Sequence, residues 1–344
     1  MVKIDTNLVF LVSENSRAKI KEMSSVLKKS SQRLKYSLNL LEKEGVIASP
    51  YCIFDYSYFG LILFRVYFKG GYISEKDKAE IIRKLGENPF VVSMYEMTGE
   101  YDIAIEISAP NPSRFNKELR KITSLIPTFT HYEIILNIVT HVYPRWYLAK
   151  NPGLGDSFKE IIVGGDREKK TFNEREMKLM KSILENPKIR LTSLAKKSSL
   201  NIKTAASLLK DLESRKIIKG FKYIIDTNKL GVSKSRLFMR LHNLGPEREA
   251  KLMEYMLSTK EIVQVNKTVG DWDMEVDIEA LDKKRSRYLI MQLREEFKDI
   301  IETFNLIEFY NYYKRAYLPM NIFQEPESPA ESKPKSLPDD TLKK

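Results

Sequence analysis

Hydrophobic residues in the first 45 positions recur at helical spacing. Leu34, Leu38 and Leu41 follow the i, i+4, i+7 rule and predict the buried stripe of one helix. Ser30 has the side chain of an N-cap, and Gly45 suits a left-handed turn that ends the helix. A preceding stretch with the same periodicity predicts a second helix. Together the two predict a helix-turn-helix.

The residues that follow this helix predict a wing. Val46-Ile47 and Ile53-Phe54 are short β-forming pairs, and Ser49-Pro50 between them is typical of a turn. We therefore expect two short strands around Ser49-Pro50, so that the N-terminal segment is a winged helix-turn-helix.

After Gly60 the pattern changes to β-forming runs interrupted by two amphipathic stretches. Their order is βαββαβ, which is typical of a ferredoxin-like sheet with its helices on one face. The other face is left bare, so a second sheet from the same or another chain must cover some of its apolar side chains. The apolar residues considered for this role are Tyr95, Ile103, Ile105 and Ile135.

The whole pattern occurs twice, at a spacing of 171 residues. The segment TGEYD at 98–102 falls on VGDWD at 269–273. Without a gap, Asp55 falls on Asp226, and Gly60 falls on Gly231. In the second copy Asn201 replaces Ser30 as the expected N-cap. One register held over so long a stretch indicates a duplication.

The sequence thus predicts an α+β protein with two tandem copies of a winged helix-turn-helix and a ferredoxin-like βαββαβ domain. Pro, Gly and charged residues between the copies suit a linker, and the Pro-, Ser- and charge-rich end suits a disordered tail. The expected boundaries are 1–56, 57–148, 149–171 (linker), 172–230, 231–320 and 321–344 (tail).

Composition places few further limits on function. The 344 residues carry a net charge of +12, which suggests a polyanionic partner such as nucleic acid or an acidic membrane surface. One cysteine, Cys52, allows neither an internal disulfide nor a cysteine-rich metal site, and we expect it to be a small apolar strand residue. The sequence has no signal peptide or membrane-spanning run, so we expect a soluble cytoplasmic protein without a metal or cofactor.

Polar and basic side chains lie on the outer face of the second helix of each helix-turn-helix, as a major-groove reader requires. Arginine and glutamine can pair with base edges, whereas lysines contact phosphates. The DNA-contacting candidates of the first copy are Lys28, Lys29, Ser31, Gln32, Arg33, Lys35, Tyr36 and Ser37. Those of the second copy are Lys196, Lys197, Lys203, Thr204, Ser207, Lys210, Lys219 and Lys222. The alternative is a helical hairpin with a solvated charged face.

Charge is unequal between the two helical segments. Residues 171–231 contain 14 Lys and Arg against 6 Asp and Glu, whereas residues 1–55 contain 9 against 6. The net charges of +8 and +3 predict that the second segment binds DNA more strongly.

The chain resembles the Lrp/AsnC family of leucine-responsive and feast/famine regulators. The features that carry the resemblance are LLEKEGVI at 40–47, Phe54-Asp55, Gly60 and TGEYD in the first copy. The second copy has DLESRKII at 211–218, Ile225-Asp226, Gly231 and VGDWD. A family chain usually has one copy, so the duplication implies an intramolecular pseudo-dimer, with homodimers or larger assemblies left open.

The resemblance implies a regulator that binds double-stranded operator DNA and responds to an amino acid or another small molecule. It places the effector pocket near the Gly-x-aromatic-Asp loops, at Gly99, Tyr101, Asp102, Gly270, Trp272 and Asp273. The alternative for these loops is a tight turn in which Asp caps backbone amides. Tyr36-Ser37 also stands where basic residues are common in the family, which weakens the DNA assignment of the first copy.

Two other functions stay open. Siroheme decarboxylases resemble the same architecture and would need basic and histidine side chains around a tetrapyrrole. His131 and His141 are ten residues apart in one predicted strand and so share a face; His242 is the third histidine. Strand histidines are more often structural, and no nucleophile motif or carboxylate pair is evident. The third function is a protein-interaction scaffold.

Overall fold

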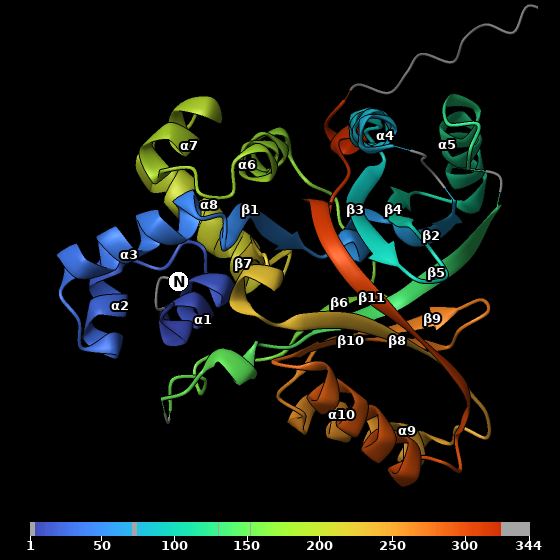
Figure 1. Ribbon diagram of the computed structural model, residues 1–344. Coiled ribbons are helices and arrows are strands. Elements are labelled where there is room, and N and C mark those ends of the chain that lie inside the picture. Colours follow the sequence, from blue (N-terminus) through green and yellow to red (C-terminus); the bar gives the residue numbers. More distant parts are fainter. Residues whose placement is uncertain (1–3, 71–73, 130, 152, 325–344) are drawn as a thin grey trace, which may run out of the picture.

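The computed structural model describes residues 4–70, 74–129, 131–151 and 153–324. Each copy has three helices and a strand, followed by a βαββαβ unit (Figure 1). The expected α+β fold with two tandem two-part copies is confirmed.

The elements follow the same order in both copies. In the first copy they are α1 (Thr6–Glu14), α2 (Ile20–Leu27), α3 (Ser31–Lys43), β1 (Ile47–Phe54), β2 (Ile62–Lys69), α4 (Glu75–Glu87), β3 (Val91–Thr98), β4 (Ile103–Ala109), α5 (Pro112–Leu125) and β5 (His131–Val142). In the second copy they are α6 (Glu174–Glu185), α7 (Leu191–Lys197), α8 (Ile202–Ser214), β7 (Ile218–Ile225), β8 (Ser233–Leu241), α9 (Pro246–Ser258), β9 (Ile262–Val269), β10 (Met274–Ala280), α10 (Lys283–Glu296) and β11 (Ile301–Arg315). Strand β6 (Ile161–Gly164) lies between the copies, and short 3-10 helices occur at Tyr56–Phe59, Trp146–Leu148, Asn228–Leu230 and Met320–Phe323.

The caps predicted for the second helix of each helix-turn-helix are present. The Ser30 side chain accepts a hydrogen bond from the backbone N–H of Arg33 at 3.3 Å, and Gly45 has a φ of +65°. In the second copy, the Asn201 side chain accepts from the N–H of Thr204 at 2.7 Å. These contacts fix where α3 and α8 begin and how α3 ends. Helices α1–α3 with β1 are called module 1 below, and α6–α8 with β7 are called module 2.

The predicted wing hairpin is wrong. Residues 47–54 form the single strand β1, which pairs antiparallel with β7 of the other copy instead of turning back at Ser49-Pro50. The pairing is irregular between Ile47 and Pro50. Proline lacks a backbone donor, so it interrupts the ladder locally, yet here it does not reverse the chain. The two modules therefore share one two-stranded sheet.

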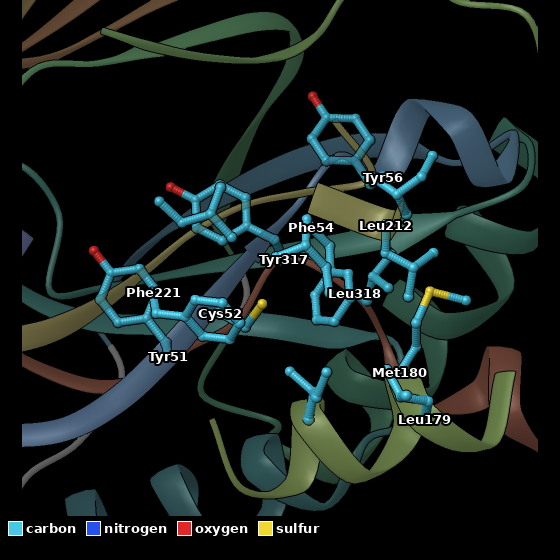
Figure 2. Packing of buried hydrophobic residues seen from close by; sticks show 14 of the residues in the cluster. Tyr51, Cys52, Phe54, Tyr56, Leu179, Met180, Leu212, Phe221, Tyr317 and Leu318 are labelled. Atoms are coloured by element: carbon cyan, nitrogen blue, oxygen red, sulfur yellow. The ribbon is translucent and has the colours of Figure 1, made fainter. Parts of the chain in front are cut away.

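The shared sheet contributes to both module cores. Ile47 of β1 packs in the core of module 1, whereas Tyr51 and Phe54 of the same strand pack against module 2. Figure 2 shows the second core, where Leu179, Met180 and Leu212 from the helices meet β1 and the C-terminal residues Tyr317 and Leu318. A strand buried in two cores ties the modules together, because moving one would expose apolar side chains of the other.

The two ferredoxin-like sheets close into one barrel. Among the described residues, eight antiparallel strands follow the order β2-β4-β3-β11-β8-β10-β9-β5 and return to β2. Closure depends on the two longest strands. Strand β5 pairs with β2 over its first half and with β9 over its second, and β11 pairs in the same way with β8 and then β3. Helices α4 and α5 flank one side of the barrel and α9 and α10 the other (Figure 1).

The apolar residues expected on the bare face divide between two environments. Ile103 and Ile105 pack beneath their own helices, together with Leu119 and Ile122. Tyr95 and Ile135 point to the barrel interior, where they meet residues of the second copy such as Phe238 and Ile307. The second sheet thus covers part of the predicted set, as expected.

The connection between the copies is more structured than a linker. Residues Ile161–Gly164 form β6, which pairs with the second half of β5. Leu154 and Val163 are buried. Of the predicted tail, residues 321–323 belong to a 3-10 helix, and 325–344 lie outside the described residues.

Candidate nucleic-acid interface

Helix α8 presents a cationic outer face. Ala205 and Leu212 are buried on its inner side, whereas Lys203, Ser207 and Lys210 are exposed. At the end of α7, Lys196 and Lys197 are exposed. An open hollow of about 670 Å³ lies between the two helices, lined by Lys196, Leu200, Asn201, Lys203 and Thr204.

Several of these lysines are available for a polyanion. Among the described residues, Lys196, Lys203 and Lys210 have no ion-pair partner within 4 Å, whereas Lys197 lies 3.7 Å from Glu185. Unpaired ammonium groups attract phosphates without first breaking an internal contact, and Lys196 and Lys203 also lie beside the N-terminus of α8.

Helix α3 of module 1 presents an outer face with a different mixture of polar, basic and aromatic side chains. Gln32, Arg33, Lys35 and Tyr36 are exposed, with 71% of the Tyr36 surface accessible. Ser31 and Lys28 are also exposed, and Ser37 is half-buried. Lys29 is partly buried and forms an ion pair with Asp5. This helix can therefore offer hydrogen bonds, one stackable ring and the positive charges of Lys28, Arg33 and Lys35, for which the described residues show no ion pair.

Two predicted DNA contacts are corrected by the structure. Lys222 has 2% of its side chain exposed and is paired with Glu14. Lys219 is also largely buried, and its Nζ lies 2.7 Å from Asp55 Oδ2. Both residues lie on β7, which pairs with β1 between the modules and is not a free wing. We therefore remove both residues from the candidate DNA-binding set.

The two Gly-x-aromatic-Asp loops are tight turns. Gly99 and Gly270 have φ of +123° and +147°, a region open mainly to glycine. Asp273 accepts a hydrogen bond from the N–H of Leu241 at 2.8 Å, and Asp102 accepts one from the N–H of Gly70. The capping role considered for these aspartates is thus present in both copies.

The aromatic residues of these loops face the barrel. Tyr101 is buried and donates a hydrogen bond to Glu133. Burial and the neighbouring Glu133 carboxylate raise its pKa far above the usual value. Trp272 packs on Phe238, with ring centroids 5.7 Å apart. The loops therefore border one aromatic cluster inside the barrel, which also contains Tyr67 and Tyr95.

The barrel interior also contains a network of buried charges that the sequence analysis missed. Arg65 pairs with Glu275 and lies 2.7 Å from Glu106. Arg236 lies 2.7 Å from Asp277 and donates to the hydroxyls of Tyr67 and Tyr95, both at 2.7 Å. The usable signal was the alternation of Glu275, Asp277 and Glu279 in β10 and of Lys234 and Arg236 in β8, which places each set on one face of its strand.

A second chain of ion pairs connects module 1 to the barrel. Lys222 of β7 pairs with Glu14 of α1, which lies 3.7 Å from Arg145. Arg145 lies 2.8 Å from Glu279 of β10, and Lys234 of β8 approaches the same carboxylate at 3.2 Å. Burial alone would raise the pKa of Glu279, but the two cations outweigh it and lower the pKa to about 2. These charges are structural contacts between layers.

The histidines do not gather at one site. His131 is the first residue of β5, His242 directly follows β8, and both are exposed. His141 pairs with Glu160 at 2.6 Å. Within the part of the chain that the structure describes, no group of His, Cys, Asp and Glu could hold a metal ion. Cys52 is buried in the core of module 2. No described helix is long and apolar enough to cross a bilayer.

Sequence comparison links part of the chain to transcription regulators. No family model matches it. The HTH-type transcriptional regulator FL11 of Pyrococcus horikoshii is 29% identical over 141 residues, which are 39% of this chain and 88% of FL11. The uncharacterized HTH-type transcriptional regulator PH0061 of the same organism is 28% identical over 127 residues, 37% of this chain and 80% of the relative. These relatives confirm the predicted resemblance to Lrp/AsnC-type regulators for that share of the chain.

Structure comparison extends the similarity to nearly the full length. The siroheme decarboxylase NirDL matches 91% of this chain and 93% of its own, with a TM-score of 0.55 and 11% sequence identity. At this identity the similarity concerns the fold alone.

Proposed function

We propose that this duplicated relative of the Lrp/AsnC-type regulators is a sequence-specific transcription regulator that binds double-stranded DNA mainly through α8. The observation that carries the proposal is the exposed cationic face formed by Lys196, Lys203 and Lys210. The kinship of part of the chain with helix-turn-helix regulators supports it.

The two helices have different roles in this proposal. Helix α8 enters the major groove, with Lys203, Thr204 and Ser207 near base edges and Lys196 and Lys210 near phosphates. Helix α3 contributes Arg33 and Gln32, which can form paired hydrogen bonds with guanine and adenine. Because β1 and β7 join the modules, both helices approach one duplex in a fixed relative orientation.

The proposal is tested by fluorescence anisotropy on genomic fragments at several salt concentrations. Replacing Lys196, Lys203 and Lys210 together by alanine should weaken binding at least about tenfold and flatten the salt dependence by about two to three counterions. The matched control replaces Lys76, Lys117 and Lys251, three exposed lysines of the ferredoxin-like domains. Equal losses in both triple variants, or none in either, would contradict the assignment of α8.

A small-molecule effector such as an amino acid is the second part of the proposal. It would bind against Tyr101 and Trp272 at the aromatic cluster, since Asp102 and Asp273 are engaged with backbone N–H groups. Isothermal titration with the twenty amino acids tests it. No heat of binding with any of them would remove this part and leave the DNA assignment intact.

The fold similarity to NirDL favours one competing function, a tetrapyrrole-decarboxylating enzyme. An absorbance titration with an iron porphyrin separates the two. We expect no shift of the porphyrin band at protein concentrations that saturate DNA. The proposed regulator acts in the compartment that contains the chromosome, the prokaryotic cytoplasm, as an intramolecular pseudo-dimer; whether two chains pair further is measured by light scattering.

A further inference from the structure

The two copies differ beside the long strands of the barrel. In the first copy, β2 pairs with β5 up to Leu63 and Asn137, and β6 then continues on the same edge over Val139–Val142. In the second copy, β8 pairs with β11 up to Ser235 and Glu308. Among the described residues, no strand continues that edge over the rest of β11. A strand edge without a partner is a template for another backbone.

A cavity lies where the missing strand would be. It measures about 220 Å³ and is lined by residues that include Ala48, Asp226, Thr227, Phe309, Asn311 and Tyr312. The spacing of 171 residues converts Asp226 into Asp55 and Thr227 into Tyr56. In the long strands the pairing register makes Tyr312 the counterpart of Thr140, because Tyr312 pairs with Tyr95 and Thr140 pairs with Asn266, the residue 171 positions after Tyr95. Asp55, Tyr56 and Thr140 are the first-copy residues around β6: Asp55 and Tyr56 contact Gly164, and Thr140 pairs with Val163. The cavity is thus the counterpart of the position that β6 fills.

The contacts of β6 describe the occupant that such a slot takes. The N–H of Gly164 donates to Asp55 Oδ1 at 3.0 Å, and that of Gly165 donates to the carbonyl of Ile138 at 2.8 Å. Further along, Arg167 Nε lies 3.1 Å from Asp55 Oδ2. The occupant is extended, with branched apolar residues at Ile161–Val163, then Gly164 and Gly165, then Asp166 and Arg167.

The slot in the second copy contains Asp226, the counterpart of the Asp55 carboxylate that binds the end of β6. Asp226 has 32% of its side chain exposed, whereas Asp55 is fully buried beneath β6, Lys219 and Arg167. Its nearest cation, Lys229 Nζ, is 3.7 Å away. The Oδ1 atom of Asp226 accepts the N–H of Asn228 at 3.0 Å, just as Asp55 Oδ1 accepts that of Ser57. Asp55 Oδ1 accepts the N–H of Gly164 in addition, so a carboxylate in this turn can accept a further peptide N–H and attract a basic side chain. Phe309 and Tyr312 supply apolar surface beside it.

We infer that the slot formed by Ala48, Asp226, Phe309, Asn311 and Tyr312 binds an extended peptide segment of a partner protein, which adds as a strand to β11. The segment has small branched apolar residues followed by glycine and a basic residue, like β6. Because the slot lies between the shared β1–β7 sheet and the barrel, an occupant contacts both layers in the second copy, as β6 does in the first.

The probe is a fluorescein-labelled peptide with the sequence of residues 158–168, FKEIIVGGDRE, added to the full-length protein. We expect saturable anisotropy with a dissociation constant on the order of 10–100 μM, and none with a scrambled peptide. Hydrogen exchange should slow at residues 309–313 of β11 and stay unchanged at residues 139–142 of β5. Absence of binding, or protection at β5 alone, would overturn the inference.

Matched variants locate the binding. Ala48→Trp fills the slot and should weaken probe binding at least about tenfold, whereas Ser49→Trp, its exposed neighbour outside the cavity lining, should stay within about twofold. Asp226→Asn removes the anchor without adding bulk and should weaken binding about fivefold. Circular dichroism checks that each variant is folded. Equal effects of the two tryptophans, or no effect of Asp226→Asn, would overturn the assignment.

The source of the natural occupant is tested by a photo-crosslinking residue at position 48 of the full-length chain. We expect cross-links to another protein in a cell extract, whose cross-linked segment matches the β6 pattern and is displaced by the probe. A cross-link within the same chain or between two copies would overturn the partner assignment, as would displacement by free amino acids alone.

Discussion

Glu279 shows how buried charge is made compatible with a folded core. Its carboxylate accepts hydrogen bonds from Arg145 Nε and the Tyr147 hydroxyl, both at 2.8 Å, and Lys234 lies 3.2 Å away. Every part of this group is shielded from water, so its stability depends on those partners. The network is a requirement of assembly more than a source of extra stability.

Removing that charge should therefore be costly. Glu279→Gln leaves Arg145 and Lys234 buried beside a neutral amide, and we expect the free energy of unfolding to fall by about 3–5 kcal/mol. Urea denaturation followed by circular dichroism measures it. Glu295→Gln, which alters an exposed carboxylate paired only with Lys298, is the control and should cause no measurable change. A small effect of Glu279→Gln would show that the network relaxes around neutral groups.

The same residue predicts the response to acid. Its pKa is about 2 in the folded chain, against an ordinary value of 4.5. A carboxyl with a depressed folded pKa stabilises the fold fully above the ordinary value, and the contribution is lost as the pH falls from 4.5 towards 2. Between pH 4.5 and pH 2, the free energy of unfolding should fall with decreasing pH in both proteins. The fall should be steeper in the native chain than in Glu279→Gln, by about 1 kcal/mol per pH unit. Parallel stability curves for the two proteins would contradict this assignment.

Single residues were also where the sequence was least informative. The caps at Ser30 and Asn201 and the stripe of Leu34 and Leu41 follow from local rules and were predicted. Lys219 and Lys222 were assigned to DNA together with the other basic residues of the second helix-turn-helix segment. Their burial depends on Asp55 and Glu14, which are far away in sequence. Local pattern cannot identify such partners.

At the scale of elements, β6 is the feature that the sequence analysis overlooked. Its Ile161, Ile162 and Val163 are strong β-formers, which was a usable signal, but the glycines and charges around them resembled a linker. The strand β1 was missed for the opposite reason, because Ser49-Pro50 suggested a turn. A proline interrupts pairing locally but cannot show whether a strand from the other copy continues it.

Gly164 makes β6 open to a direct test. Its φ is +89°, and an added Cβ would lie 2.6 Å from the Tyr56 hydroxyl and 2.8 Å from the Ile138 carbonyl. Gly164→Val should destabilise the protein by about 2 kcal/mol and speed hydrogen exchange at residues 161–163. Gly86→Ala in α4 is the control, because the nearest side-chain atom to the added Cβ, Met94 Cε, is 3.9 Å away. Unchanged exchange in Gly164→Val would mean that β6 is held by other contacts.

At the scale of the whole molecule, the duplication was visible from the 171-residue spacing, whereas the way the copies combine was not. The barrel closes because β5 and β11 each pair with a strand of both copies. Pairing between segments that are distant in sequence has no clear signature in the local residue pattern. The divergence of the copies is equally important for function. Helix α3 offers Gln32, Arg33 and Tyr36 where α8 offers Lys203, Thr204 and Ser207.

Unequal recognition helices predict an operator without two-fold symmetry. A dimer of identical modules reads a palindrome, because each half-site meets the same side chains. Here in vitro selection from random DNA should yield sites with two different halves. Palindromes made by repeating either half should bind at least about tenfold more weakly than the selected site. Selection of a palindrome as the best ligand would contradict the division of roles between α3 and α8.

Strands β5 and β11 each pair with one strand of their own copy and one strand of the other copy. This arrangement also affects how such a protein can evolve. A single repeat would leave backbone N–H and C=O groups unpaired at the edges of its sheet. As separate gene products, the two repeats would therefore have to be made in equal amounts and associate at low concentration. Fusion into one polypeptide fixes their stoichiometry at one to one. Each repeat is then free to accumulate its own substitutions, because its counterpart is always the other half and never a copy of itself.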